Sequence, residues 1–315
     1  MNDTSNFDLF YDVIDESIGK LYEIKHKPFM NLLIETAKNI VSSEVISKEA
    51  TKEQKDELMN IYARLEDVEF NVEDIRKVFQ VMILRAFKED NLKFGDLTPD
   101  TLGFFIAYLI SKLYPNKEKL TILDPVCGPG NLLYSVANHL NKEVKLFGID
   151  IVREYAELAS ILGDLLYYDI EIFCQDTLTH PFNSIDVVVA DINANGNIKE
   201  EKYFPYLVII EHLSSLKKDG YFIGILPNDF FEHDSDGFFK EKLKESSSSV
   251  LGVLSLPINM FKENPKSIII FSKKEVSGNK CLLVDLPSFS GPGKLNQALL
   301  QIENWFLINL KEEEV

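Results

Sequence analysis

The spacing of apolar residues predicts a helical first part of the chain. Between residues 71 and 90, apolar side chains recur at every third or fourth position behind Asn71, a residue type that caps helices. Residues 51–66 predict a second, more polar helix. Because few β-branched runs interrupt this region, we predict a helical domain over residues 1–92, with a linker at about 91–97.

A further helix is predicted directly after the linker. Thr98 is its expected cap and Pro99 its expected first residue, a position where the missing proline N–H costs little. Apolar residues then recur at helical spacing as far as Leu113, and Pro115 ends the helix.

From residue 120 onward, short apolar runs alternate with amphipathic segments. Continuous apolar runs separated by helices are typical of a parallel sheet that is covered on both faces. A run at 267–272 follows after only a short loop, which favours antiparallel pairing. The other runs are 120–123, 144–149, 170–173, 185–190, 221–226 and 250–256, and the helical segments lie near 130–140, 153–167, 203–218 and 236–246.

The tail of the chain predicts one more strand at 282–285 and a helix from about 295 to 310, joined by a turn-rich loop. We therefore predict an α/β domain over 98–275 and an extension packed on it over 276–315.

The charge balance narrows the class of protein. The 315 residues are 45% hydrophobic, enough for a sizeable core, and 33 Lys and Arg against 50 Asp and Glu give a net charge of −17. This acidic balance disfavours a protein that holds DNA by its overall field, but it leaves a local basic groove as an alternative. Candidates for such a groove are Lys199, Lys202, Lys262 and Lys266, which are otherwise ordinary solvated lysines.

Other residue types point to a cytoplasmic protein without a metal site. The three cysteines lie far apart and form no zinc-binding spacing, and the histidines form no HExxH pair. The first residues are polar and acidic, unlike a signal peptide, and no apolar run approaches the ~18 residues of a membrane span.

A glycine loop carries the strongest chemical signal. Asp124-Pro125-Val126-Cys127-Gly128-Pro129-Gly130-Asn131 follows a predicted strand and opens a predicted helix, as a nucleotide-type ligand loop does. Asp150 ends the next strand, where a carboxylate can accept hydrogen bonds from ribose hydroxyls. Leu133 replaces the third glycine of a dinucleotide loop, and no Walker A motif is present, so NAD and ATP are disfavoured. The Asp-Pro-x-x-Gly-x-Gly form instead resembles the S-adenosylmethionine loop of class I methyltransferases, and a tight turn without a ligand is the alternative.

The order of several motifs makes the chain resemble the N6-adenine DNA methyltransferases. The likeness is to the modification subunits of bacterial type I systems, and more closely to small stand-alone bacterial relatives of that subunit. It implies a class I methyltransferase fold, with a mostly parallel, Rossmann-like seven-stranded sheet behind the helical domain, and S-adenosylmethionine as the cofactor. The motifs lie at 97–100, 124–133, 147–150, 174–176, 220–231, 256–261, 266–268 and 286–290.

The same resemblance implies a cofactor site. Thr98 would lie near the methionine end of the cofactor, Asp150 at its ribose and Asp176 at its adenine amino group, although Thr98 and Asp176 could instead serve as local caps. The full implied set is Thr98, Asp124, Pro125, Gly128, Gly130, Asp150, Asp176 and Asp191.

The catalytic motif departs from the family pattern. The family carries Asn or Asp, two prolines and Phe or Tyr after the fourth strand, and this chain carries Asp191-Ile192-Asn193-Ala194. Asp191 keeps the acidic position, so we predict Asp191 and Asn193 as catalytic residues. The missing aromatic ring removes a base-stacking contact of about 1–3 kcal/mol. The candidates to replace the lost polar and stacking groups are Asn195, Tyr203, Phe204, Phe230 and Phe231.

The leading functional hypothesis is methyl transfer to the amino group of a nucleic-acid adenine. Without a recognisable target-recognition domain, the chain is expected to bind DNA weakly alone and to need a specificity partner. The rivals are a cofactor-binding protein that is catalytically impaired, with a regulatory or assembly role, and a methyltransferase that acts on a protein or small molecule.

Overall fold

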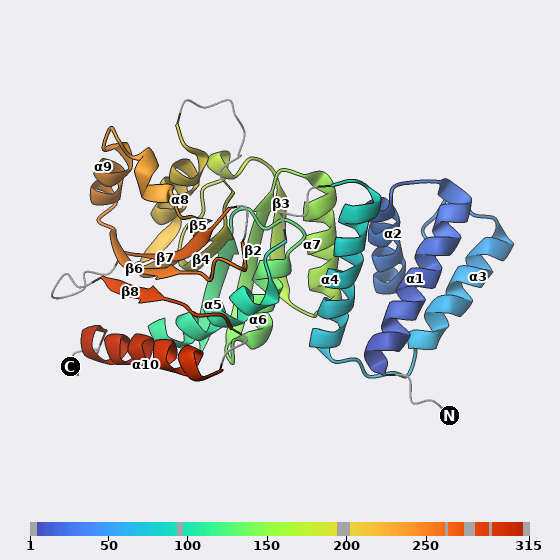
Figure 1. Ribbon diagram of the computed structural model, residues 1–315. Coiled ribbons are helices and arrows are strands. Elements are labelled where there is room, and N and C mark those ends of the chain that lie inside the picture. Colours follow the sequence, from blue (N-terminus) through green and yellow to red (C-terminus); the bar gives the residue numbers. More distant parts are fainter. Residues whose placement is uncertain are drawn as a thin grey trace.

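The computed structural model describes residues 5–92, 97–193, 202–261, 264–273, 281–289 and 292–310. The amino-terminal helices form a bundle at one end of the molecule, beside an α/β body that contains the sheet (Figure 1). The predicted helical amino-terminal domain is therefore confirmed. Its helices are α1 (Asn6–Lys25), α2 (Phe29–Ser42), α3 (Lys52–Tyr62) and α4 (Val72–Glu89). Asn71 caps α4 as predicted, because its side chain accepts a hydrogen bond from the N–H of Glu73.

Within the described residues, the body contains eight strands in one sheet, in the order β3-β2-β1-β4-β5-β7-β6-β8. Among these, β7 runs antiparallel to both neighbours, as its short preceding loop predicted, and the other pairs are parallel. The strands are β1 (Lys119–Asp124), β2 (Glu143–Asp150), β3 (Asp169–Cys174), β4 (Ile185–Asp191), β5 (Leu216–Pro227), β6 (Ser249–Ser255), β7 (Lys266–Ser272) and β8 (Leu282–Asp285).

Helices cover both faces of the sheet, which explains the continuous apolar runs. Along β4, Val187 and Val189 pack into one hydrophobic cluster, and Val188 and Ala190 pack into the other. The first cluster includes α5, α6, α7 and α10, and the second includes α8 and α9. These helices are α5 (Asp100–Leu113), α6 (Asn131–His139), α7 (Arg153–Leu165), α8 (Phe204–Ser215), α9 (Phe238–Glu245) and α10 (Pro292–Asn309).

Two details differ from the sequence-based expectations. The part of the sheet that the structure describes has eight strands rather than seven, because β8 from the tail extends it beside β6. Thr98 does not cap α5: Pro99 holds the cap position without a side-chain hydrogen bond, and the Thr98 hydroxyl bonds elsewhere. Most of the expected linker, residues 93–96, lies outside the described residues.

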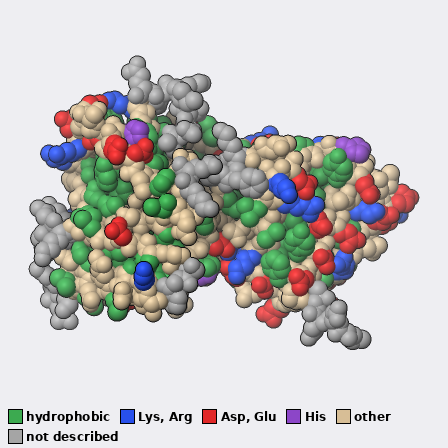
Figure 2. Space-filling view, in the orientation of Figure 1, with side chains coloured by type: hydrophobic (Ala, Val, Ile, Leu, Met, Phe, Trp, Pro, Cys, Tyr) green, Lys and Arg blue, Asp and Glu red, His purple; other side chains and the backbone are tan. Residues whose placement is uncertain are grey.

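Acidic and basic side chains alternate on one face of the molecule. On the face shown in Figure 2, the basic side chains of the helical bundle lie among acidic ones rather than in a continuous stripe, as far as the described residues go. Within the same part of the chain, no helix combines the length and the apolar character that a membrane span requires.

Candidate functional site

The glycine loop lies at the carboxyl edge of the sheet, between β1 and α6. Gly128 and Gly130 have positive φ angles of 53° and 88°, a backbone conformation that side chains disfavour. A Cβ at Gly130 would also lie 2.4 Å from the ring of Tyr134. The loop is tied to the sheet because the N–H of Cys127 donates to the carbonyl oxygen of Ile149 on β2. Glycine is thus needed here for both the turn and its packing.

Asp150 is fixed against this loop. Its Oδ2 accepts a hydrogen bond from the N–H of Gly128 (2.8 Å), and its Oδ1 accepts one from the N–H of Val152 (2.8 Å). The carboxylate therefore lies at the end of β2 and beside the loop, which is the register that the sequence predicted.

Asp176 lies after the neighbouring strand, β3. It begins the short 3₁₀ helix η3 (Thr177–Thr179), and its Oδ1 accepts a hydrogen bond from the N–H of Leu178 (3.0 Å). The local capping role is therefore present, and a contact with adenine stays a prediction.

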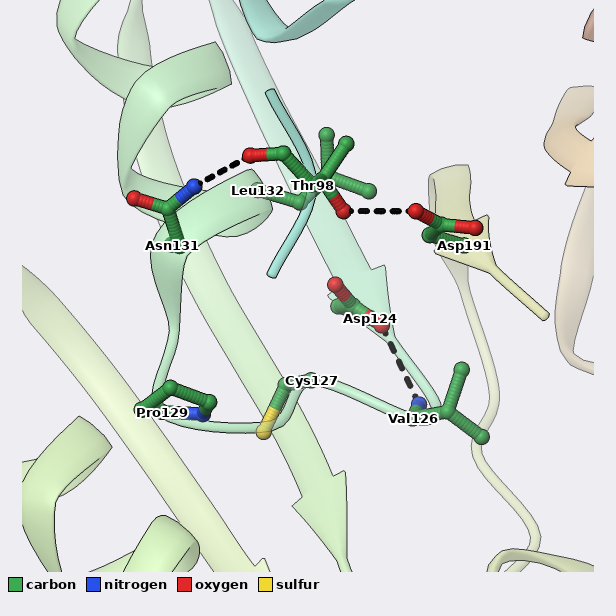
Figure 3. A pocket seen from close by; sticks show the side chains of 8 residues that line it. All are labelled: Thr98, Asp124, Val126, Cys127, Pro129, Asn131, Leu132 and Asp191. Carbon is green, nitrogen blue, oxygen red and sulfur yellow. Dashed lines mark hydrogen bonds between the residues drawn. The ribbon is translucent and has the colours of Figure 1, made fainter. Parts of the chain in front are cut away.

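A pocket opens between the loop and β4. Figure 3 shows Thr98 between two partners: its hydroxyl donates to Asp191 Oδ2 (2.9 Å), and its carbonyl oxygen accepts from Asn131 Nδ2 (2.6 Å). Three predicted site residues, Thr98, Asp124 and Asp191, thus meet in one place. The pocket is lined by Thr98, Asp124, Val126, Cys127, Pro129, Asn131, Leu132 and Asp191.

Asp124 is an almost fully buried carboxyl group in this pocket, with 1% exposure. Burial raises its pKa well above the ordinary value, and the nearby charges of Asp150 and Asp191 raise it further. A hydrogen bond from the N–H of Val126 opposes this shift. Two acidic side chains, Asp124 and Asp191, therefore line the pocket, which disfavours a phosphate ligand and suits a cationic one.

Asp191 has a second partner that the sequence did not reveal. Lys266, the first residue of β7, donates from Nζ to Asp191 Oδ1 and to Asn193 Oδ1, the latter at 2.8 Å. Lys266 is only 4% exposed, so its assignment to a basic groove or to solvent was wrong. The available signal was a lysine at the start of a strand predicted to run antiparallel, because such a strand begins at the edge of the sheet where its parallel neighbours end.

The structure gives a reason for the missing first proline of the catalytic motif. Ile192 is buried, and its N–H donates to the carbonyl oxygen of Ile225 (3.1 Å), so the contact between β4 and β5 continues one residue past Asp191. Proline has no N–H and would lose this bond. Asn195 and Lys199 lie outside the described residues.

The candidate aromatic substitutes are divided between core and surface. Phe230 is fully buried, Phe231 is 48% exposed, and Phe204 begins α8. Tyr203 stacks on His233, with 4.0 Å between ring centroids, and burial raises its pKa to about 12. Tyr203 is therefore packed locally rather than free to stack on a base.

The residues of the pocket fit S-adenosylmethionine, which carries a sulfonium and an ammonium group. The glycine backbone gives close approach, Asp150 holds its carboxylate beside the loop, Asp191 offers negative charge, and a cation would favour the ionised form of Asp124. Within the described segments, no group of three or more His, Cys, Asp or Glu side chains is arranged to hold a metal ion.

Comparisons with known proteins agree with this fit. Residues 8–87 match the family described as the YtxK N-terminal helical domain, and residues 116–275 match the family described as a methyltransferase domain. The uncharacterised protein YtxK of Bacillus subtilis is 31% identical over 277 residues, which cover 78% of this chain and 82% of YtxK.

Solved structures show the same fold. A Listeria monocytogenes protein assigned to the class I S-adenosylmethionine-dependent methyltransferases superposes with a TM-score of 0.86 at 27% identity, covering 95% of this chain and 98% of that one. A protein assigned as the modification subunit of a type I restriction enzyme from Vibrio vulnificus gives a TM-score of 0.60 at 16% identity, covering 86% of this chain and 65% of that one. The predicted fold class is confirmed: the chain belongs to the methyltransferase-domain family, with a class I fold, S-adenosylmethionine as its cofactor and a YtxK-type helical domain ahead of it.

Proposed function

We propose that the chain transfers a methyl group from S-adenosylmethionine to an amino group, with a nucleic-acid adenine as the leading acceptor. The observation that carries this proposal is the position of Asp191. Its carboxylate ends β4 and lines the same pocket as Thr98, Asp124 and the glycine loop. The fold shared with type I modification subunits supports adenine in DNA as the acceptor and a specificity partner as an aid to recognition.

In this proposal the chain's own residues hold and orient the two reactants. Asp150 and the loop backbone bind the ribose side of the cofactor, and Thr98 lies near its methionine side. Bound S-adenosylmethionine supplies the electrophilic methyl group. Asp191 accepts a hydrogen bond from the acceptor amino group, which directs the nitrogen lone pair toward that methyl group.

A second candidate function is cofactor binding with impaired transfer, and Lys266 favours it. Its ammonium group already donates to both Asp191 and Asn193, the two predicted catalytic side chains. An acceptor nitrogen gains positive charge during methyl transfer, and a fixed ammonium group beside it opposes that charge. In this role the protein would act as a regulator or assembly partner that responds to the cofactor.

The cofactor site is tested by calorimetry with S-adenosylmethionine. We expect Asp150→Ala to weaken binding by about 1.5–3 kcal/mol, because charged hydrogen bonds are lost. The matched control is Asp169→Ala, which removes an exposed carboxylate at the start of the adjacent strand β3. Equal affinity of a folded Asp150→Ala protein and the wild type would refute the assignment.

The two candidate functions are separated by transfer of a labelled methyl group to DNA, RNA and cell lysate. Adenine methylation that Asp191→Ala abolishes supports the first candidate. Tight cofactor binding without transfer, together with transfer gained in Lys266→Met, supports the second. Lys273→Met is the control, because Lys273 follows the other end of β7 and donates to the carbonyl oxygen of Leu216, away from the pocket.

A further inference from the structure

Arg76 on helix α4 is a buried cation at the boundary between the helical bundle and the α/β body. Its side chain is 1% exposed. The guanidinium donates to both carboxylate oxygens of Glu73 (2.8 and 2.7 Å) and to both of Asp100 (2.9 and 2.8 Å). Two bidentate pairs fix the plane of the guanidinium as well as its position.

These bonds reach the two segments that carry the pocket. Asp100 begins α5, two residues after Thr98, so the pair with Arg76 holds the start of this helix. Arg76 Nη1 also lies 3.4 Å from Oδ1 of Asn131, the first residue of α6. Asn131 in turn donates from Nδ2 to the carbonyl oxygen of Thr98 (2.6 Å). Both Thr98 and Asn131 line the pocket, whereas Arg76 does not.

A second contact fixes the other end of α6 to the same helix. Glu73 Oε2 accepts a hydrogen bond from Asn138 Nδ2 (2.9 Å), near the carboxyl end of α6. Helix α4 therefore holds α6 at both ends through one ion-pair cluster around the buried Arg76. A shift of α4 would move Asn131 and Thr98 with it.

We propose that Arg76 is a positioning residue of the cofactor site, and that the helical domain and S-adenosylmethionine binding are energetically coupled through it. The helical domain then contributes to cofactor affinity, because it positions residues of the pocket. Coupling of two equilibria is reciprocal. If α4 helps to form the pocket, the bound cofactor must stabilise α4 by the same free energy.

The first test compares two arginines of the same helix. Lysine cannot reproduce the two bidentate pairs, so we expect Arg76→Lys to weaken S-adenosylmethionine binding about 10-fold or more by calorimetry. Arg85→Lys is the matched control: Arg85 pairs with Asp15 and Glu89 at the surface, and its side chain is 37% exposed. Equal affinities of the two variants would overturn the proposal. Asp100→Asn, which leaves Arg76 paired with Glu73, gives a milder loss in the same direction should Arg76→Lys not fold.

A purely structural role for Arg76 is tested with a destabilised helical domain. Tyr62→Phe removes hydrogen bonds to Ser17 (2.6 Å) and Asn39 (3.0 Å) within the bundle, without touching the pocket. We expect this variant to melt at a lower temperature but to keep its cofactor affinity. A loss of affinity in Tyr62→Phe that matches the loss in Arg76→Lys would show that general stability alone sets binding, and would overturn the proposal.

Reciprocal coupling is measured by amide hydrogen exchange. Saturating S-adenosylmethionine is expected to slow exchange in the peptide that covers residues 72–89 of the wild type. Arg76→Lys, at cofactor saturation, is expected to lose most of this protection. An unchanged exchange rate in α4 of the wild-type protein would refute the coupling.

Discussion

At the scale of single residues, Asp124 is expected to make the stability of the fold and the binding of the cofactor depend on pH. Burial raises its pKa well above the ordinary value of a carboxyl group, so the folded protein keeps a proton that the unfolded chain releases near pH 4. Between the pKa of the carboxyl group in the unfolded chain, about 4, and its raised pKa in the folded protein, the folded state binds more protons than the unfolded state. The free energy of unfolding therefore falls as pH rises between these two values. Asp124 thus costs stability in the ligand-free protein, which is acceptable for a residue whose charge serves binding.

Replacement of Asp124 by Asn tests this cost. The free energy of unfolding of ligand-free Asp124→Asn should fall less than that of the wild type as pH rises above about 4, because the buried amide does not titrate. Denaturant unfolding at several pH values measures the difference. Identical pH slopes for the two proteins would show that Asp124 is already ionised in the fold.

The same residue predicts proton release when the cofactor binds. A cationic ligand beside Asp124 favours its ionised form, so the proton that the free protein held is released to the buffer. Calorimetry in two buffers that differ in ionisation enthalpy should give different apparent binding enthalpies for the wild type, and a smaller difference for Asp124→Asn. Equal enthalpies for the wild type in both buffers would contradict this prediction.

At the scale of elements, His212 joins α8 to the short helix η3 that follows Asp176. It is fully buried, and its Nε2 lies 2.7 Å from the Thr177 hydroxyl. Burial lowers its pKa to about 4, so the fold is stabilised by neutral His212 above pH 6.5 and loses that contribution as pH falls toward 4.

His212→Gln removes this titration. The wild type should lose up to about 3 kcal/mol between pH 6.5 and 4 through this group, and the variant should show a correspondingly flatter slope. His233→Gln is the control, because the His233 side chain is 42% exposed. A slope for His212→Gln equal to that of the wild type would show that His212 is not the acid-sensitive group.

Local patterns predicted the elements, and long-range contacts account for most of what they missed. The strand, glycine loop and helix around Gly128 follow from neighbouring residues, as does Asp150 at the end of the next strand. In contrast, Thr98 meets Asp191 across 93 residues and Lys266 meets it across 75. No local spacing encodes such contacts. Because the side chains of Thr98 and Lys266 both bond to Asp191, Thr98 does not cap α5 and Lys266 does not line a basic groove.

At the scale of the whole molecule, the acidic charge disfavours tight binding to DNA. The net charge is −17, and each phosphate contact requires a positive group that also steepens the salt dependence of binding. Of the four candidate groove lysines, Lys266 is buried against Asp191, and Lys202 pairs with Asp236 at 2.6 Å. Lys199 and Lys262 lie outside the described residues. Both described lysines of this set are therefore paired with carboxylates.

The isolated chain is accordingly expected to bind duplex DNA weakly, with little preference for sequence and a shallow dependence on salt. Because the ammonium group of Lys202 is already paired with Asp236, Lys202→Met, which removes that charge without reversing it, should change DNA affinity less than about 3-fold at low salt. Cofactor affinity should also be unchanged, because neither residue lines the pocket. Fluorescence anisotropy across a salt series measures both the affinity and the slope.

Asp236→Lys is the converse variant. It adds two positive charges relative to the wild type, and it should strengthen DNA binding and steepen the dependence of binding on salt. Tight, salt-resistant binding of one DNA sequence by the wild-type chain alone would contradict the need for a specificity partner.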